Sequence, residues 1–310
     1  MIDKKVFRLP LREWIILSRP PFHTVGIFPF LLGTLLAWRT DQIFHIDIFL
    51  LGLLAVILIM LSTYQSGEYY DFQEDKISKS IFPSRFAGGS GVMPAGGVSG
   101  KIPLWTSVIS FLIAGVIGLV LQFNYHTGSY TLLLGCLGAL PGFFYSTRPV
   151  RLVETGAGEL LIGFCYGWLP VAAAFYIQTA YLHHLIHWLA LPIGLSIFNV
   201  ILINEFPDYE ADRQVGKKNL LVRLGRSWAK GIYIAFAVLS CLGMFLSIRA
   251  GVPGKALYLY LPVMLLSLCL MGMVFTNKDR NRKTLEGMCG LTIAVNLGTT
   301  GSYLLAYWLS

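Results

Sequence analysis

Long apolar runs separated by short polar segments dominate the pattern along the chain. Nine of these runs approach the ~20 residues that a helix needs to cross a bilayer. Residues 1–21 mix basic and apolar side chains before them, which favours an interfacial segment that Pro20 and Pro21 end. The pattern therefore predicts an N-terminal interfacial segment over 1–21 and one transmembrane domain over 22–310. We expect spans over roughly 22–38, 46–66, 104–123, 130–145, 159–179, 185–203, 229–248, 257–275 and 285–309.

The composition is typical of a membrane protein. Hydrophobic residues make up 55% of the sequence and charged residues only 13%, which excludes an ordinary soluble domain. Apart from Arg39, Arg249 and Lys255, every Lys and Arg falls on one side of a nine-span arrangement. Because cytoplasmic loops carry the positive excess, we expect an integral protein of a bacterial or archaeal inner membrane with its N-terminus in the cytoplasm. The net charge of +8 then reflects topology and contact with membrane lipid, and no nucleic-acid partner is expected.

Two acidic stretches stand where apolar runs give way to polar residues on that same side. Glu68, Asp71 and Asp75 follow the second run at spacings of three and four residues, so a continued helix carries them on one face. Asp208 and Asp212 follow the sixth run and share a face in the same way. Carboxylates held together at a membrane edge need cations, and such oxygen ligands suit Mg²⁺. We therefore expect a magnesium site, against the alternative that these are ordinary solvated acids of the loops.

Basic residues near the acids complement a phosphorylated substrate. Arg85, Arg148 and Lys217 are expected to bind diphosphate oxygens while Mg²⁺ bridges from the carboxylates. For each of these bases the alternative is a simple topology signal. The glycine cluster at residues 88–91 predicts either a backbone N–H nest for phosphate or a flexible turn. A transporter of divalent cations is the rival class, and an acid deep in a span would favour it.

The motifs resemble those of the UbiA superfamily of intramembrane prenyltransferases. Residues 67–75 (GEYYDFQED) lie on the family's first motif, N-D-x-x-D-x-x-x-D, and residues 208–212 (DYEAD) match its second, D-x-x-x-D. Residues 145–152 (YSTRPVRL), followed by 158–161 (GELL), are most similar to the branch that prenylates 1,4-dihydroxy-2-naphthoate in menaquinone synthesis. Residues 86–91 (FAGGSG) indicate the same branch.

The resemblance implies a fold and a reaction. The fold is an all-α integral membrane protein with nine transmembrane helices around a central cavity and cytoplasmic capping loops. The reaction is Mg²⁺-dependent: a polyprenyl diphosphate ionises to an allylic cation, which an aromatic acceptor attacks, and in the naphthoate branch the carboxyl group is lost. Together with the residue pattern, it predicts catalytic roles for Asp71, Asp75, Asp208, Asp212 and Tyr145, metal ligation by those four aspartates and Glu68, and diphosphate binding by Arg85, Arg148, Lys217 and Asn204.

The first motif departs from the family pattern. Gly67 stands in place of the family's Asn and Glu68 in place of its first Asp, so an amide that helps to hold one Mg²⁺ is missing. Gln65 lies on a different helical face and does not replace it. Other acceptors stay open within the same class, namely 4-hydroxybenzoate, another ring or a lipid headgroup. A phosphatidyltransferase is excluded because its D-G-x-x-A-R signature is absent.

Overall fold

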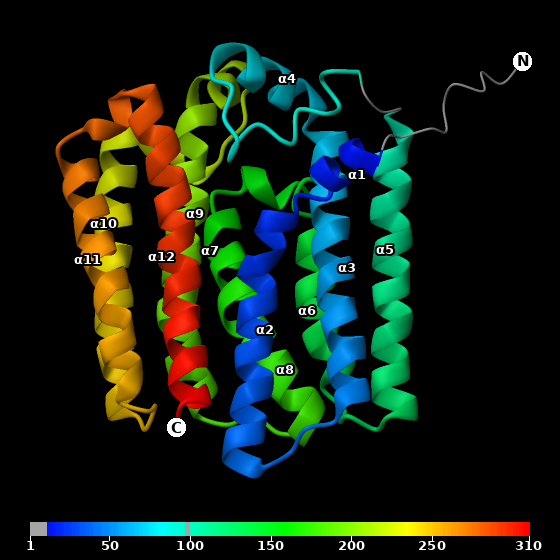
Figure 1. Ribbon diagram of the computed structural model, residues 1–310. Helices are drawn as coiled ribbons and strands as arrows, with labels where there is room; N and C mark the ends of the chain where they lie inside the picture. The colour runs from blue at the N-terminus through cyan, green and yellow to red at the C-terminus, as the bar shows by residue number, and fades with distance from the viewer. Residues whose placement is uncertain (1–10, 97–99) are drawn as a thin grey trace, which may run out of the picture.

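The computed structural model describes residues 11–96 and 100–310. Within these ranges all regular secondary structure is helical, which confirms the all-α prediction. Long helices stand side by side in one bundle, and α4 with its loop lies across one end (Figure 1). Two π-helical turns, η2 (Val120–Asn124) and η4 (Phe164–Trp168), extend α5 and join α7 to α8. The α-helices are α1 (Leu11–Leu17), α2 (Pro20–Asp41), α3 (Ile46–Tyr70), α4 (Phe72–Ile81), α5 (Lys101–Leu119), α6 (Thr131–Phe143), α7 (Gly158–Gly163), α8 (Leu169–Thr179), α9 (Leu185–Val215), α10 (Leu220–Arg249), α11 (Lys255–Phe275) and α12 (Arg282–Trp308).

Every predicted span coincides with a helix or with consecutive helices. In the part of the chain that the structure describes, seven helical segments are long and apolar enough to cross a membrane. The helix α6 is shorter, with 13 residues, and α12 is not among the seven. These helices indicate an integral membrane protein, whereas the nine-span count and the cytoplasmic side of the capping loops stay predictions.

The first long helix begins at the prolines that the sequence predicts to end the N-terminal segment. Pro20 and Pro21 occupy the first turn of α2. Proline is tolerated there because the first N–H groups of a helix have no partner within it. Of the predicted interfacial segment, residues 1–10 lie outside the described residues, and α1 exposes Leu11 while burying Leu17.

The two helices that carry the acidic stretches differ in their continuity. Helix α3 ends at Tyr70, and Asp71 is both its C-cap and the N-cap of α4. Helix α9 continues without a break to Val215, about three turns beyond the predicted span. It ends at Gly216, whose φ of 75° is the left-handed conformation that glycine adopts most readily. Because α4 packs against α9, the two acidic stretches meet at one end of the bundle (Figure 1).

Small residues allow α9 to approach the helix formed by α7, η4 and α8. A Cβ atom on Gly167 would overlap the backbone of Gly194, and one on Gly194 would lie 3.0 Å from the carbonyl oxygen of Gly163. Close backbone approach of this kind gives the van der Waals contact on which helix association in lipid depends. The crossing packs the first half of α9 against the helix formed by α7, η4 and α8.

Candidate active site

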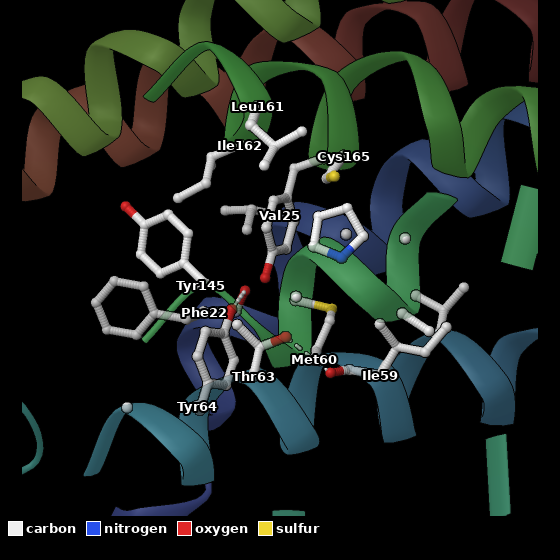
Figure 2. A pocket seen from close by; sticks show the side chains of 18 of the residues that line it. Phe22, Val25, Ile59, Met60, Thr63, Tyr64, Tyr145, Leu161, Ile162 and Cys165 are labelled. Atoms are coloured by element: carbon white, nitrogen blue, oxygen red, sulfur yellow. Dashed lines mark hydrogen bonds between the residues drawn. The ribbon is translucent and has the colours of Figure 1, made fainter. Parts of the chain in front are cut away.

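The bundle encloses a cavity of about 540 Å³, bordered mainly by α2, α3, α5, α6, α8 and α9. Figure 2 shows the rings of Phe22, Tyr64 and Tyr145 gathered at one end, with Ile59 and Cys165 further along. Most of the wall is apolar, and all five predicted metal-binding carboxylates also line it. A chamber with an apolar wall and an acidic rim suits an amphiphile whose apolar tail lies against the wall and whose anionic head is held through a cation at the rim.

The carboxylates of the first stretch are held by two separate loops. Glu68 accepts hydrogen bonds from the N–H of Ser90 (2.5 Å) and its hydroxyl (2.7 Å), in the loop after α4. Asp71 accepts hydrogen bonds from the hydroxyl of Ser146 (2.5 Å) and from Arg151 (2.9 Å), both between α6 and α7. Loops from both sides therefore fix the break between α3 and α4.

The carboxylates of the second stretch are bound from three directions. Asp208 accepts a hydrogen bond from the hydroxyl of Ser78 on α4 and another from the N–H of Gly88, at 2.9 Å. Asp212 accepts one from the side chain of Asn219 at 2.8 Å and lies 3.5 Å from the ammonium of Lys217. The turn between α9 and α10 thus closes back on α9.

Two consecutive glycines show that the acidic stretches face each other. A Cβ atom on Gly89 would overlap the carboxylate of Asp75 and lie 3.3 Å from that of Glu68, whereas one on Gly88 would lie 3.4 Å from that of Asp208. Both glycines have a positive φ, 67° at Gly88 and 62° at Gly89, so the backbone also favours glycine here. The predicted nest therefore exists as a tight loop, but the N–H groups of Gly88 and Ser90 donate to carboxylates.

Burial and mutual repulsion both disfavour the ionised form of these carboxylates. Burial raises the pKa of Asp75 well above its usual value, and the charges of Asp71, Glu68 and Asp208 raise it further. Burial also raises the pKa of Asp71 to about 7, against the opposing charge of Lys217. Burial alone would lower the pKa of Lys217, but the surrounding carboxylates raise it well above its usual value. These carboxylates stay ionised together only when positive charge balances them, so the cluster suits a bound cation.

The structure brings most of the predicted site residues to the cavity, but not all of them. Tyr145, Asn204 and Lys217 line it together with the five carboxylates. Arg85 and Arg148 are exposed and are not among the lining residues. Arg85 lies in the loop after α4 and Arg148 in the loop between α6 and α7, and the backbone N–H of Arg85 donates to the carboxylate of Glu286 on α12. Their diphosphate-binding role stays a prediction that this geometry does not support.

Arg151 is the buried base that the sequence reading missed. Its guanidinium donates to Asp71 and to Glu74, each at 2.9 Å, and only 7% of the side chain is exposed. Burial would lower the pKa of Arg151, but the charges of Asp71 and Glu74 raise it. The only sequence signal for Arg151 is its place three residues after Arg148. The sequence does not single it out, because bases that set membrane topology and bases that serve a site look alike in a basic loop.

The oxygen donors fit a hard divalent cation, although their arrangement is not that of a formed metal site. Within residues 11–96 and 100–310, no three acidic, His or Cys side chains have the geometry to hold an ion together. Serine hydroxyls, backbone N–H groups and Arg151 occupy the carboxylate oxygens instead. The side-chain oxygen of Asn204 is buried without a hydrogen-bond partner in the described part of the chain, which leaves it free for a ligand.

A family model describing the UbiA prenyltransferase family matches residues 26–289. The chain belongs to the UbiA prenyltransferase family. It is thus a prenyltransferase and an integral membrane protein, in agreement with the resemblance of its motifs.

Similar proteins include enzymes that are named for prenyl transfer to 1,4-dihydroxy-2-naphthoate. The 1,4-dihydroxy-2-naphthoate octaprenyltransferase of Bacillus subtilis is 29% identical over 223 residues, which cover 72% of this chain and 69% of the relative. The enzyme of the same name from Escherichia coli is 28% identical over 258 residues, 79% of each chain. A UbiA homolog from Archaeoglobus fulgidus, solved with GPP and Mg²⁺, has a TM-score of 0.65 at 14% identity and covers 93% of this chain and 99% of its own. This likeness shows that the prenyltransferase has the same fold.

Proposed function

We propose that this prenyltransferase transfers a polyprenyl group from an isoprenyl diphosphate to 1,4-dihydroxy-2-naphthoate with the help of Mg²⁺. The observation that carries the proposal is the meeting of two acidic stretches, through Gly88 and Gly89, at the rim of an apolar cavity. The naphthoate activity of the Bacillus subtilis and Escherichia coli relatives supports the choice of acceptor. The complex of the Archaeoglobus homolog with GPP and Mg²⁺ supports the donor and the metal.

The carboxylates are the proposed metal ligands. Bound Mg²⁺ neutralises the diphosphate and stabilises it as a leaving group. Lys217 lines the same rim, where its ammonium would lie beside the diphosphate oxygens. Asn204 also lines the cavity, and its buried side-chain oxygen has no hydrogen-bond partner in the described part of the chain, so it is a second candidate contact for the metal-bound head. The ligands would be Glu68, Asp71, Asp75, Asp208 and Asp212.

The aromatic end of the cavity suits the reacting carbon. The rings of Phe22, Tyr64 and Tyr145 lie together there (Figure 2), and the faces of aromatic rings attract a developing allylic cation. Water reaching such a cation would divert it to an alcohol, so the apolar wall also protects the transfer. The polyprenyl tail then extends along the wall past Ile59 and Cys165.

The proposed orientation in the membrane gives the diphosphate substrate and the lipid-soluble product different routes. We propose nine spans with the N-terminus and the acidic rim on the cytoplasmic side, as the distribution of Lys and Arg indicates. The diphosphate head would enter from the cytoplasm, and the lipid-soluble product would leave into the bilayer.

A reconstituted assay tests this function. Membranes or purified protein receive Mg²⁺, a labelled polyprenyl diphosphate and, in separate reactions, 1,4-dihydroxy-2-naphthoate, 4-hydroxybenzoate or a glycerol-based lipid acceptor. We expect a prenylated product and CO₂ only with the naphthoate. Product with another acceptor would overturn the acceptor assignment, and cation flux into proteoliposomes without any diphosphate would overturn the prenyl transfer itself.

A further inference from the structure

An acidic residue that the proposed reaction leaves without a role lines the same cavity. Glu205 lies on α9 three residues before Asp208, about 4.5 Å deeper along the helix axis. Glu205 lies two residues beyond the predicted span 185–203, and an ionisable group that lines a mainly apolar cavity is a candidate functional position. Glu205 belongs to neither acidic motif and is not one of the proposed metal ligands.

A second glutamate stands beside it. The N–H of Leu220 donates to Glu159 at 2.9 Å and the next N–H, that of Leu221, donates to Glu205 at 3.3 Å. Because these amides are consecutive at the start of α10, the two carboxyl groups are neighbours. Glu159 is only 1% exposed, and its second oxygen is buried without a hydrogen-bond partner among the described residues.

The chemistry of the substrate groups indicates which of them can bind to Glu205. The diphosphate head is a polyanion that a carboxylate repels, and the polyprenyl tail has nothing to donate. An aromatic acceptor has hydroxyl groups, which donate hydrogen bonds to a carboxylate. The ring of Tyr145 lies at this place too, because its Cε2 is 3.2 Å from where a Cβ of Gly158, next to Glu159, would lie.

We infer that Glu205 is the acceptor-contacting base of the cavity: it accepts a hydrogen bond from an acceptor hydroxyl and takes that proton as the ring carbon attacks. Glu159 is its positioning residue, held by the same helix start. The inference rests on the proposed function, because it assigns the acceptor end of that reaction.

The step balances without another reactant. The bond between the allylic carbon and the diphosphate oxygen breaks, and its electron pair leaves with the diphosphate. The carboxyl-bearing ring carbon forms the new carbon–carbon bond, the adjacent hydroxyl becomes a carbonyl, and its proton moves to Glu205. Loss of CO₂ from this β-keto acid returns the electron pair to the ring oxygen, which takes the proton back from Glu205.

The test compares Glu205→Gln with Glu159→Gln and with the control Asp47→Asn, which changes an exposed acid at the start of α3. Each purified protein is assayed for prenyl transfer to the acceptor and for binding of the unreactive farnesyl thiolodiphosphate with Mg²⁺. We expect Glu205→Gln to lower kcat by about 10²-fold or more, as loss of a general base does, while Kd for the donor analogue stays within about twofold. Glu159→Gln should lower kcat less, and Asp47→Asn should match the wild type.

Each outcome decides the inference. Transfer by Glu205→Gln at the wild-type rate, or an equal loss of donor binding and transfer, would overturn it while leaving the proposed function intact. A wild type that prenylates no aromatic acceptor would overturn the proposed function and this inference with it. If Glu205→Gln does not fold, Glu205→Asp, which keeps the carboxylate but withdraws it, must still lower kcat by about tenfold at unchanged donor binding.

Discussion

At the scale of single residues, the side chains that hold the carboxylates matter as much as the carboxylates themselves. Arg151 donates to Asp71 and Glu74 from a position that is 7% exposed, and Ser146 binds the other oxygen of Asp71. A buried ion pair whose one partner is removed leaves an uncompensated charge, which is strongly unfavourable. Arg151 therefore sets where Asp71 lies before any ligand binds.

Replacing Arg151 tests this positioning role. Arg151→Gln should raise the Mg²⁺ concentration for half-maximal activity and lower kcat by about 10–100-fold, as is typical for residues that orient metal ligands. Arg151→Lys, which keeps the charge, should recover part of the loss. The matched control is Arg249→Gln, an exposed arginine at the end of α10, which should behave as wild type. An unchanged Mg²⁺ requirement in Arg151→Gln would contradict the role.

Gly67 offers a complementary test at the position of the missing amide. A Cβ there would lie 3.7 Å from the hydroxyl of Ser146 and 3.8 Å from a carboxylate oxygen of Asp71, so a side chain fits and points toward the site. Gly67→Asn should therefore fold and lower the Mg²⁺ concentration needed for half-maximal activity. Gly67→Ala controls for the added bulk and should leave that concentration unchanged. Equal Mg²⁺ titrations for the Asn and Ala variants would show that the amide oxygen does not reach the metal.

At the scale of elements, the loop after α4 is the part that closes the site. Its N–H groups bind carboxylates from both α3 and α9, so the loop links two helices that are far apart in sequence. Both Gly88 and Gly89 favour glycine because their φ angles are positive, and because a Cβ would overlap the side chain of Ser78 at Gly88 and the carboxylate of Asp75 at Gly89.

Alanine substitutions at two glycines of the same loop distinguish the effect of a contact with Asp75 from the effect of backbone strain. Gly89 and Gly96 both have a positive φ, 62° and 75°, so an alanine costs about 1–2 kcal/mol at either one. Only at Gly89 does the new Cβ overlap Asp75, whereas nothing lies within 4 Å at Gly96. Gly89→Ala should therefore lower kcat by about tenfold or more, and Gly96→Ala should leave it near the wild-type value. Equal kcat values for the two variants would show that the Asp75 contact has no part in catalysis.

At the scale of the whole molecule, the hydrophobic pattern predicted nearly all of the helices, and most of the side chains predicted for the site line the cavity. The runs are visible because each helix must satisfy its backbone in lipid, which imposes length and apolarity on the sequence. The acidic spacing predicted the shared faces of Asp208 and Asp212 and their place on a continued α9. The break of α3 at Asp71 was missed, because no proline marks it.

What the sequence did not reveal depends on contacts between distant segments. Arg151 and Arg148 differ by three residues, yet one is buried against Asp71 and the other is exposed. Glu205 and Glu159 are 46 residues apart in the sequence, and only the start of α10, whose consecutive N–H groups donate to them, shows that they are neighbours. Such roles are set by the packing of the bundle, so spacing along one helix does not predict them.

The central claim is that both acidic stretches hold one metal-bound diphosphate at the rim of the cavity. The most direct measurement is calorimetric titration of Mg²⁺ into the purified protein with farnesyl thiolodiphosphate present, for the wild type and for Asp71→Asn and Asp208→Asn. We expect each substitution alone to weaken Mg²⁺-dependent binding of the analogue by about tenfold or more, since the ligands act on the same ion-bound head. Wild-type binding in either variant would contradict the account, because that acidic stretch would then not contact the metal.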